Sequence, residues 1–501
     1  MIFEPIANII SKSEYEEKIL IYIRLVEVIC TKHNITLIDS DLCNKAVVSE
    51  LTDMGIISTE KDLLELKKLL KENYDRFLKC VNTYLSNKDL FGNALDKLNN
   101  KKRRILQEKE RKSGKPNFVD FFAGAGGLSC GFVQAGFRVV FANDHEDVCI
   151  RTYKYNHPEL PSESVLKEDI RKIVNKIDDY VKEEVDIVVG GPPCQSFSSA
   201  NQRRVIDDPR NVLYKYYIDA IKQLAPKIIL MENVKGMLSV ADQVIADYKA
   251  IEIEKNGKKY TYDVAYRLLN AVNFGVCQSR ERFIFIAVRN DVAESKHISP
   301  ETIFSEIEST YSLYTPQNLQ VALDFIKPLD APRIKGQTET DDEKTGMKIG
   351  LNQFDSCGNN YLKRINGGRQ IDFVFNHKAR YCSDVNYEIF RRLGQGEDST
   401  NPKIADIMPY ANRNDIFKDK YYKLIANKPS RTITAHLKMD CLSHIHPTQI
   451  RSITPREAAR VQSFPDDYLF LGAYLKTYMQ IGNAVPVLMA KQIAEVIKKY
   501  L

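Results

Sequence analysis

The sequence predicts an α/β fold with a doubly wound, mostly parallel sheet. Three observations support this prediction. Short apolar segments alternate with helical ones between about residues 117 and 290, a glycine-rich turn (Ala123–Gly127) follows the first of them, and a Gly-Gly-Pro-Pro-Cys run starting at Gly190 follows a later one. Such alternation is typical of parallel strands joined by helices. Open sheets of this kind carry their working residues beyond the carboxyl ends of the strands.

Composition limits the classes of protein. The chain has 501 residues, 44% of them hydrophobic, which is enough for two or three domains. The net charge of +6 is modest and only weakly favours a polyanionic partner. No run reaches the roughly 18 apolar residues of a membrane helix, and the N-terminus lacks a secretory pattern. The ten cysteines form no C-x-x-C pair, so we expect neither disulfides nor a metal site, and a cytoplasmic location.

Residues 1–114 are predicted to form a helical extension. Apolar residues recur at helical spacing over 13–31 and 59–85. A basic run follows and ends at the breaker Ser113-Gly114-Lys115-Pro116. The run fits either a solvated helix face or an arm that contacts phosphates, and the sequence leaves both open. Its members are Lys97, Lys101, Lys102, Arg103, Arg104, Lys109, Arg111, Lys112 and Lys115.

The central part, 115–290, is predicted to be the catalytic domain. Between about 291 and 450 the pattern becomes irregular, and 451–501 returns to the catalytic domain, with a helix over 475–501. Apolar content and turn residues place the strands and helices. The expected strands are 118–122, 138–142, 185–189, 227–231 and 282–288, with a helix over 128–136 and another near Tyr180.

The glycine turn and the next strand together indicate a nucleoside-containing cofactor. Glycines allow a tight turn and a close approach of the backbone to a ligand at a helix N-terminus. The second strand ends in Asn143-Asp144, and an acid at that tip is the position that binds ribose hydroxyls. The turn lacks the G-x-x-x-x-G-K-[ST] pattern, which argues against a triphosphate.

Cys194 is the candidate nucleophile. It lies just beyond a buried strand, after Pro192-Pro193 and before Gln195-Ser196-Phe197-Ser198. A cysteine is often a small buried hydrophobe, but this rigid polar surrounding argues against a core position. A thiolate held there can attack an electrophilic carbon.

Two further segments place charge near the same crevice. Glu232 follows an apolar strand at its carboxyl end, and Arg280 and Arg282 precede another strand at alternate positions. The carboxylate could instead cap a helix, and the arginines could be surface charges. Arginines on one face could also bind a phosphate or a base bidentately.

In this order, the segments resemble the C5-cytosine DNA methyltransferase family. Glu232-Asn233-Val234 is similar to its ENV segment, and Gln278-x-Arg280-Glu281-Arg282 to its QxRxR segment. The resemblance covers about 117–501 and leaves the first hundred residues outside. Its remaining blocks are Asp120 to Gly127, Pro192 to Gln195, Thr454 to Arg460 followed by Gln462 to Pro465, and Gln480 to Pro486.

The resemblance implies a class I, Rossmann-like methyltransferase fold and S-adenosylmethionine as cofactor, with no metal. Asp144 would bind the ribose hydroxyls and Asp169 the adenine amino group, with the adenine held near His145 and Ile170. His145 stands where the family commonly has an apolar residue, and Cys277 where it often has proline. The full set of implied cofactor residues is Phe122, Ala123, Gly124, Gly126, Gly127, Asp144, His145, Asp169, Ile170, Pro192, Asn483 and Ala484.

The implied chemistry agrees with the residue types. Cytosine C5 is a poor nucleophile, and addition of the Cys194 thiolate at C6 makes it an enamine carbon that can attack a methyl sulfonium. Glu232 would hold a proton at N3, so that negative charge does not accumulate on the ring. Arg280 and Arg282 would position the base and the catalytic loop. The base that removes the C5 proton is not identified.

A stacked cytosine cannot reach such a pocket, so the nucleotide has to be flipped out of the duplex. The irregular region 291–450 resembles the family's target-recognition domain, which reads the major groove. A hydroxyl of Thr432 would contact a phosphate beside the flipped base. The predicted DNA-contacting residues are Gln195, Ser198, Arg364, Arg369, Arg431 and Thr432.

Three functions remain open. The leading one is a DNA (cytosine-5)-methyltransferase, either with a cognate restriction endonuclease or solitary. A tRNA-directed relative would carry a Cys-Phe-Thr tripeptide, which this sequence lacks. A non-catalytic DNA-binding regulator would have no need of the intact Cys194 and Glu232. We expect a monomer acting on double-stranded DNA, in which the N-terminal region could extend the DNA contact, mediate dimerisation or bind a partner.

Overall fold

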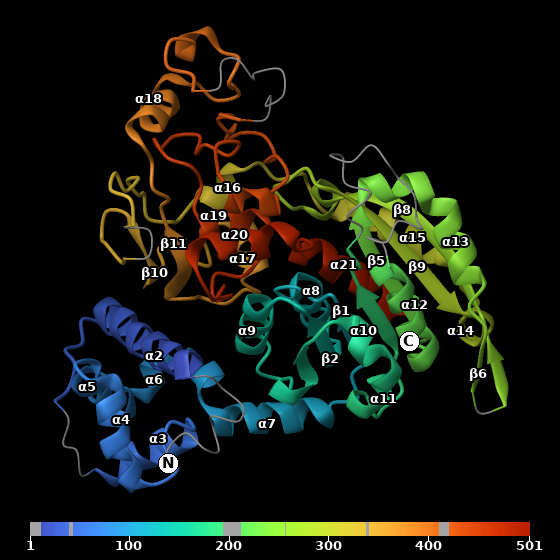
Figure 1. Cartoon of the computed structure of the whole chain (residues 1–501), viewed down its shortest axis with the longest axis horizontal. Helices are drawn as coiled ribbons and strands as arrows, with labels where there is room; N and C mark the ends of the chain where they lie inside the picture. Colours follow the sequence, from blue (N-terminus) through green and yellow to red (C-terminus); the bar gives the residue numbers. More distant parts are fainter. Residues whose placement is uncertain (1–11, 40–43, 194–211, 256, 337–339, 410–419) are drawn as a thin grey trace.

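A seven-stranded sheet forms the centre of the molecule (Figure 1). The computed structural model describes all residues except 1–11, 40–43, 194–211, 256, 337–339 and 410–419. Strand order is β3-β2-β1-β4-β5-β9-β8, and the first five strands are parallel. This confirms the predicted doubly wound sheet. The parallel strands are β1 (Asn117–Phe121), β2 (Arg138–Asp144), β3 (Val165–Lys167), β4 (Ile187–Gly190) and β5 (Ile228–Val234).

Two antiparallel strands complete the sheet, β9 (Glu281–Arg289) beside β5 and β8 (Tyr262–Asn270) at the edge. The sequence pattern predicts neither β8 nor the three-residue strand β3. Strand β8 mixes buried residues with the exposed Asp263 and half-buried Arg267, as an edge strand allows, so it lacks a continuous apolar run.

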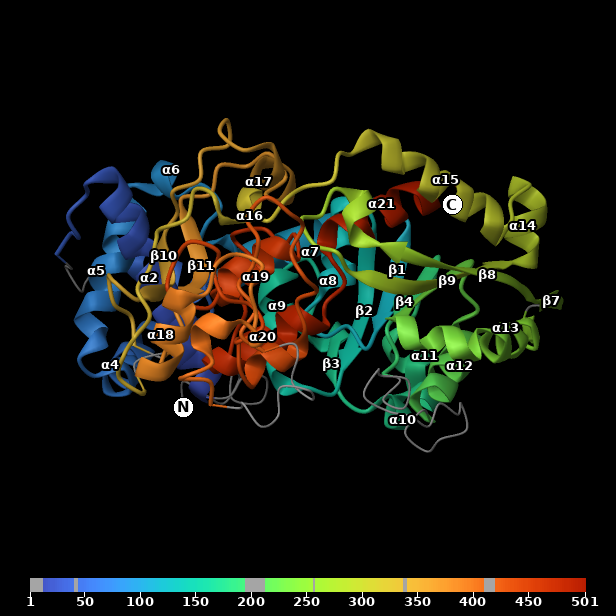
Figure 2. The ribbon, with the colours of Figure 1, turned by 90° about the horizontal axis from the view of Figure 1, so that it is seen from above.

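Helices cover both faces of the sheet (Figure 2). Alternate residues of a strand point to opposite faces, so Ile187 and Val189 belong to one core and Val188 to the other. One face packs against α8 (Gly127–Gln134), α15 (Pro300–Ser309) and α21 (Val487–Lys498). The other packs against α10 (Ile170–Ile173), α11 (Ile177–Tyr180), α12 (Val212–Leu224) and α13 (Ala241–Lys249). Helix α9 (Asp147–Asn156) follows β2, and α14 (Asn290–Lys296) follows β9.

Three helix predictions need correction. The helix expected over 59–85 is broken at Lys71, which has φ +50° and separates α4 from α5 without a glycine or proline to mark the break. The helix expected over 475–501 is interrupted at Ala484–Pro486, because proline offers no amide to continue the helix. The helix near Tyr180 is a single turn.

The N-terminal extension is helical, as predicted. Its apolar residues form a core that also contains Ile349, Phe373 and Leu469 from distant parts of the chain. The extension consists of α2 (Lys12–His33), α3 (Lys45–Asp53), α4 (Leu63–Leu70), α5 (Asn73–Ser86), α6 (Lys88–Phe91) and α7 (Asn100–Arg111).

The region predicted to be irregular contains short regular elements, so that prediction was too coarse. A two-stranded antiparallel hairpin joins β10 (Gly346–Leu351) to β11 (Phe373–Lys378). Neither strand alternates between apolar and polar residues: β11 is buried along its whole length although its second half is Asn376-His377-Lys378, and β10 contains two glycines. Among the described residues of 291–450, α14 and α15 pack on the sheet, and the further α-helices are α16 (Gln320–Leu323), α17 (Asn360–Ile365) and α18 (Asp384–Arg392).

The C-terminal segment returns to the sheet through α19 (Pro455–Val461), α20 (Tyr474–Asn483) and α21. Buried ion pairs hold it: Arg451 Nη2 lies 2.6 Å from Glu457 Oε1, and Arg460 Nε lies 2.7 Å from Asp466 Oδ1. One apolar core runs from β1 through 319–365 to α21, so the predicted domain limits stay predictions. Among the described residues, no helix is long and apolar enough to cross a membrane.

Candidate active site

Four strands bring their following residues to one edge of the sheet. Phe121 pairs with both Asn143 and Gly190, and Gly190 pairs with Met231. Each of these four paired residues is followed by a residue of the candidate site. The four followers therefore lie together toward the carboxyl ends of β1, β2, β4 and β5, and they are Phe122, Asp144, Gly191 and Glu232. This is where open α/β sheets bind ligands.

The glycine turn after β1 has the conformation that its sequence predicts. Phe122, Gly124 and Gly126 all have positive φ, at +56°, +55° and +86°. A Cβ on Gly124 would meet nothing within 4 Å, so this side of the turn is open, whereas one on Gly127 would lie 2.7 Å from the carbonyl oxygen of Val485. The turn thus offers a bare backbone on one side and packs tightly against the C-terminal segment on the other.

Asp144 is tied to this turn. Its Oδ2 accepts a hydrogen bond from the amide of Gly124 at 2.9 Å, and its Oδ1 accepts one from the amide of Glu146 at 2.8 Å. Burial raises the pKa of Asp144, and the two amide donors oppose that shift. The neighbouring His145 is largely exposed, at 68% of its side chain. The carboxylate is therefore preorganised beside the open side of the turn.

Asp169 and Ile170 lie at the start of α10. Asp169 caps the helix by accepting from the amide of Arg171 at 2.9 Å, and its carboxylate also binds the Arg171 side chain, which lowers the pKa of Asp169. Asn143 Nδ2 donates to the carbonyls of Leu166 and Glu168 at 3.1 and 2.7 Å. These bonds join the end of β2, which carries Asp144, to the segment that leads to Asp169. Both acids thus belong to one hydrogen-bonded edge.

A third carboxylate, that of Asp120, is fully buried in β1, just before the turn. Its Oδ2 accepts a hydrogen bond from Ser129 Oγ at 2.6 Å, and Ser129 in turn accepts one from the Tyr153 hydroxyl at 2.6 Å. Its Oδ1 has no hydrogen-bond partner in the structure. Burial raises the pKa of Asp120 to about 7, with Ser129 opposing and Asp144 adding to the shift.

The chain leading to Cys194 is fixed from the side of β5. Asn233 Nδ2 donates to the carbonyl oxygen of Pro192 at 2.9 Å. The Glu-Asn-Val segment predicts no role for Asn233 beyond its place next to Glu232, and that adjacency is the only sequence signal for this contact. The predicted residues Cys194, Gln195 and Ser198 lie outside the described residues.

Glu232 and Arg282 form a buried ion pair. Glu232 is opposite Ile284 in the β5–β9 register, which puts Arg282 two residues along on the same face. Arg282 Nε lies 2.7 Å from Glu232 Oε1, and both side chains are nearly buried, with 13% and 11% exposed. Burial lowers the pKa of Arg282, and Glu232 opposes this. A Cβ on Gly191 would lie 3.1 Å from Glu232 Oε2, so the carboxylate abuts the strand end that leads to Cys194.

Arg280 ties three segments together. Its guanidinium is fully buried and donates to the carbonyls of Ile433, Gly482 and Ala484 at 2.5, 2.8 and 2.9 Å. Burial lowers the pKa of Arg280. Arg280 is therefore a positioning residue that fixes the segment around Thr432 and the end of α20, where Asn483 is exposed and Ala484 buried.

The segment after Ser430 runs along this edge. Thr432 Oγ1 donates to the carbonyl of Ser279 at 2.8 Å, and the amide of Ile433 donates to Gln278 Oε1 at 2.7 Å. A Cβ on Gly482 would lie 2.2 Å from the carbonyl carbon of Thr434, so only glycine allows this approach. The segment thus connects the Arg282 side of the site to the end of α20.

The family model described as C-5 cytosine-specific DNA methylase matches residues 116–499. The chain belongs to the C-5 cytosine-specific DNA methylase family. Type II methyltransferase M.AgeI of Thalassovita gelatinovora is 32% identical to this methylase over 432 residues, covering 76% of this chain and 98% of the relative. Type II methyltransferase M.DdeI of Desulfomicrobium norvegicum is also 32% identical, covering 77% of this chain and 89% of that protein.

A solved E. coli structure of a prophage-encoded protein has the same fold, with a TM-score of 0.58 at 23% identity over 77% of this chain and 99% of that one. None of these matches extends over the whole methylase, and the family model starts only at residue 116. The N-terminal helices therefore lie outside the matched family region.

The predicted DNA-contacting arginines of the methylase have protein partners. Arg369 binds Asp467 through two hydrogen bonds of 2.7 and 3.0 Å. Arg364 lies over the ring of Tyr314 at 4.3 Å and donates to the carbonyl of Phe274 at 3.3 Å. Arg431 lies over the ring of Tyr422 at 4.6 Å. Their contact with DNA stays a prediction.

Proposed function

We propose that the chain is a DNA (cytosine-5)-methyltransferase that flips a cytosine out of a specific short sequence and methylates its C5 from S-adenosylmethionine. The Glu232–Arg282 pair carries the proposal, because it sets a carboxylate beside the strand end that leads to Cys194. Burying these two charges has a desolvation cost that the pairing offsets only in part, and charged groups held in this way are concentrated at functional sites.

The residues of the edge fit S-adenosylmethionine. The open side of Gly124 leaves backbone accessible to a ligand, and the preorganised carboxylate of Asp144 suits ribose hydroxyls. Phe122, Ala123, Gly126 and Gly127 would surround its methionine part, with Asp169, Ile170, His145, Pro192, Asn483 and Ala484 completing the pocket. When bound, the cofactor supplies a methyl group on a sulfonium, which is the electrophile for C5.

The protein groups act on the pyrimidine. The Cys194 thiolate forms a bond to C6, and the electron pair of the C5–C6 double bond moves toward C5. Glu232 holds a proton at N3 and thereby prevents charge from building up on the ring. After methyl transfer, a base removes the C5 proton, the C6–S bond breaks, and the thiolate is regenerated. Arg282 keeps Glu232 in place, and Arg280 holds the Thr432 segment over the site.

Covalent trapping tests this mechanism. Duplex DNA containing 5-fluorocytosine should form a complex that survives denaturing electrophoresis, because fluorine at C5 leaves no proton to remove. Cys194→Ala should abolish the complex and methyl transfer while retaining DNA binding, and Cys357→Ala, a change at an exposed thiol, should retain all three. Methylation by Cys194→Ala at a comparable rate would refute the assignment.

Substrate class and partners follow from the same assays. Labelled cofactor offered with DNA or tRNA separates the DNA enzyme from a tRNA-directed one, and transfer to neither would favour a regulator.

The relatives are named type II methyltransferases, so we propose a restriction–modification system with a cognate endonuclease. Methylation-sensitive sequencing of cells that express the chain would reveal the recognition sequence. A cytoplasmic location and a monomeric state stay predictions.

A further inference from the structure

The N-terminal helices share one apolar core with the β10–β11 hairpin. Ile349 of β10 and Phe373 and Phe375 of β11 are buried among residues of α2, α5 and α6, and Leu469 and Leu471 of the C-terminal segment join them. Both views show α2 beside the hairpin (Figures 1 and 2). Separating the two parts would expose this apolar surface to water, which is unfavourable.

Charged residues along α2 reinforce the contact. Glu17 pairs with two parts of the chain at once: Lys348 Nζ of β10 lies 3.0 Å from its Oε1, and Arg151 of α9 binds its Oε2. Two further pairs join α2 to the hairpin region, Arg24 with Asp341 and Lys32 with Asp372. Positions 17, 24 and 32 are about two helical turns apart, so they lie along one face of α2.

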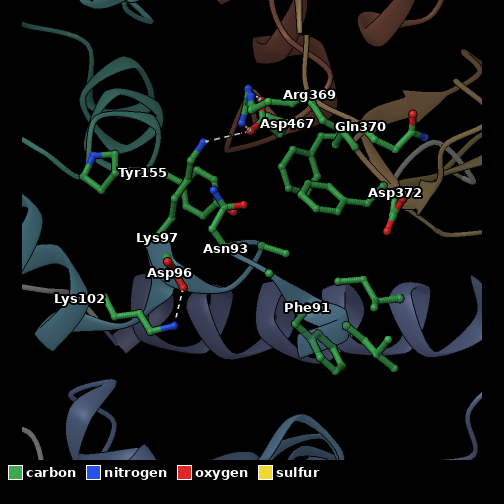
Figure 3. A pocket seen from close by; sticks show the side chains of 18 of the residues that line it. Phe91, Asn93, Asp96, Lys97, Lys102, Tyr155, Arg369, Gln370, Asp372 and Asp467 are labelled. Atoms are coloured by element: carbon green, nitrogen blue, oxygen red, sulfur yellow. Dashed lines mark hydrogen bonds and ion pairs between the residues drawn. The ribbon is translucent and has the colours of Figure 1, made fainter. Parts of the chain in front are cut away.

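A second line of contact joins the end of the extension to the catalytic body (Figure 3). Lys97 Nζ donates to the carbonyl of Asp467 at 3.4 Å and lies 5.6 Å from the Tyr155 ring, and Arg103 donates to the carbonyl of Lys154 at 3.1 Å. A cavity of about 710 Å³ lies between these contacts and the contacts of α2 with the hairpin. Lys97, Lys102 and Arg369 on its wall are each paired with a carboxylate of the protein, so we assign it no ligand.

The hairpin is fixed from its other side by the C-terminal segment. Arg456 Nε donates to the carbonyl of Phe375 at 2.6 Å, Asn376 Nδ2 to the carbonyl of Phe470 at 2.9 Å, and the Tyr474 hydroxyl to the carbonyl of Lys378 at 3.0 Å. Beyond β11 the chain enters a separate apolar cluster that includes Phe390 and Tyr421. The orientation of the hairpin therefore determines where this cluster of the recognition region lies.

We infer that the N-terminal helices are an intramolecular brace that holds the recognition region at a fixed distance from the catalytic sheet, with Glu17 as its central positioning residue. DNA has to contact both parts, so the brace sets the affinity for DNA and the discrimination between sequences without touching either the DNA or the reacting atoms. The core of the sheet already includes Leu319 and Tyr361 of this region, so the brace acts on the hairpin and on the cluster beyond it, whose apolar residues belong to other cores. This inference rests on the proposed function.

The test compares Glu17→Gln with the matched control Glu65→Gln in the full chain. Glu65 pairs with Lys68 on the exposed surface of α4, 2.8 Å away, and with no other cation in the part of the chain that the structure describes. Glu17→Gln should raise KM for DNA about three- to tenfold and reduce discrimination against a site with one base changed, with kcat and cofactor affinity unchanged. Hydrogen exchange in β10 and β11 should be faster. Glu65→Gln should leave every quantity at the wild-type value.

A charge exchange separates positioning from simple destabilisation. Lys32→Glu should raise KM for DNA, and adding Asp372→Lys should restore it, since the pair is rebuilt in reverse. A lower melting temperature for Glu17→Gln with unchanged KM and discrimination would overturn the inference and leave the helices a purely structural part. If the wild-type chain transfers no methyl group to DNA, the proposed function fails, and the hydrogen-exchange result still reports whether the brace exists.

Discussion

At the scale of single residues, the site depends on groups whose charge is controlled by burial. Glu232 is held by Arg282, the Arg280 guanidinium donates its hydrogen bonds to backbone carbonyls, and Asp120 keeps one oxygen without a partner among the described residues. Each arrangement is unfavourable on its own and persists because surrounding packing fixes it. Two of these residues yield predictions that separate chemistry from stability.

Glu232→Gln should lower kcat by about 100- to 10,000-fold, because an amide cannot hold the proton at N3. It also leaves the buried Arg282 without its carboxylate, so we expect a loss of stability of about 3–5 kcal/mol. Single-turnover methylation and thermal unfolding measure the two effects. Glu281→Gln, which removes an exposed carboxylate 2.9 Å from Lys235, is the control and should change neither strongly. A Glu232→Gln protein that retains wild-type kcat would contradict the role of Glu232.

Asp120→Asn should stabilise the cofactor-free protein at neutral pH. Burial raises the pKa of Asp120 to about 7 in the folded state. Between pH 4 and 7 the unfolded chain therefore releases a proton that the folded chain retains, and this carboxyl's contribution to stability falls as pH rises through that window. Asparagine mimics the neutral carboxyl and should be more stable by about 2–4 kcal/mol above pH 7, with no difference near pH 4.

Unfolding curves of both proteins at several pH values give this difference. A gap that stays constant from pH 4 to pH 8 would show that Asp120 does not titrate within the window.

At the scale of elements, the active site is assembled at places where backbones approach closely. The turn after β1 packs against the segment between α20 and α21, and the end of α20 packs against Thr434. Glycine is required at both contacts. The first contact joins Gly127 to Val485, more than 300 positions away, so the cofactor turn is completed only when the C-terminal segment has docked.

Gly127→Ala should disrupt this docking. Its Cβ would lie 2.7 Å from the carbonyl oxygen of Val485 and 2.9 Å from the Cβ of Ala484. We expect a loss of stability of about 1–3 kcal/mol and weaker binding of S-adenosylhomocysteine, measured by calorimetry. Gly350→Ala is the matched control, because its nearest neighbour would be at an ordinary 3.8 Å. Equal cofactor affinity in the two variants would argue against the role given to this contact.

At the scale of the whole molecule, the basic run lies on the side away from the site. Helix α7 leads directly into β1 and so lies at the amino ends of the parallel strands, below the sheet in Figure 1. Several of its cations already have partners, such as Lys101 with Asp53 and Lys112 with Glu108. Of the two interpretations of the basic run, this arrangement favours a solvated helix face and argues against an arm that contacts DNA phosphates.

Replacing Arg104, Lys109 and Arg111 together by glutamine should therefore leave the salt dependence of DNA affinity unchanged. Arg431→Gln, beside the Thr432 segment, should reduce the slope of log K against log salt concentration by about one. Fluorescence anisotropy at several salt concentrations measures both. A slope reduced by two or three in the triple variant would return α7 to the DNA interface.

Local patterns sufficed to predict the parallel strands β1, β2, β4 and β5, the glycine turn and the acid at the tip of β2. Each of these is specified by a few neighbouring residues: apolar runs for β1 and β4, positive φ at Gly124 and Gly126, and a polar residue where β2 ends. The edge strands β3 and β8 and the hairpin β10–β11 were not predicted, because these strands are stabilised by pairing with other parts of the chain. The break at Lys71 was not predicted either, because no glycine or proline marks it.

The sequence by itself determined the fold class, the order of the functional blocks and the residue types available for chemistry, because these depend on periodicity and turn preferences within short windows. Only the tertiary structure decided that Arg282 pairs with Glu232, that Arg280 joins Ile433 to Gly482, and that the N-terminal helices cover the hairpin. Such contacts are selected by the burial of apolar surface and the pairing of desolvated charges across the whole chain, and no local pattern records them.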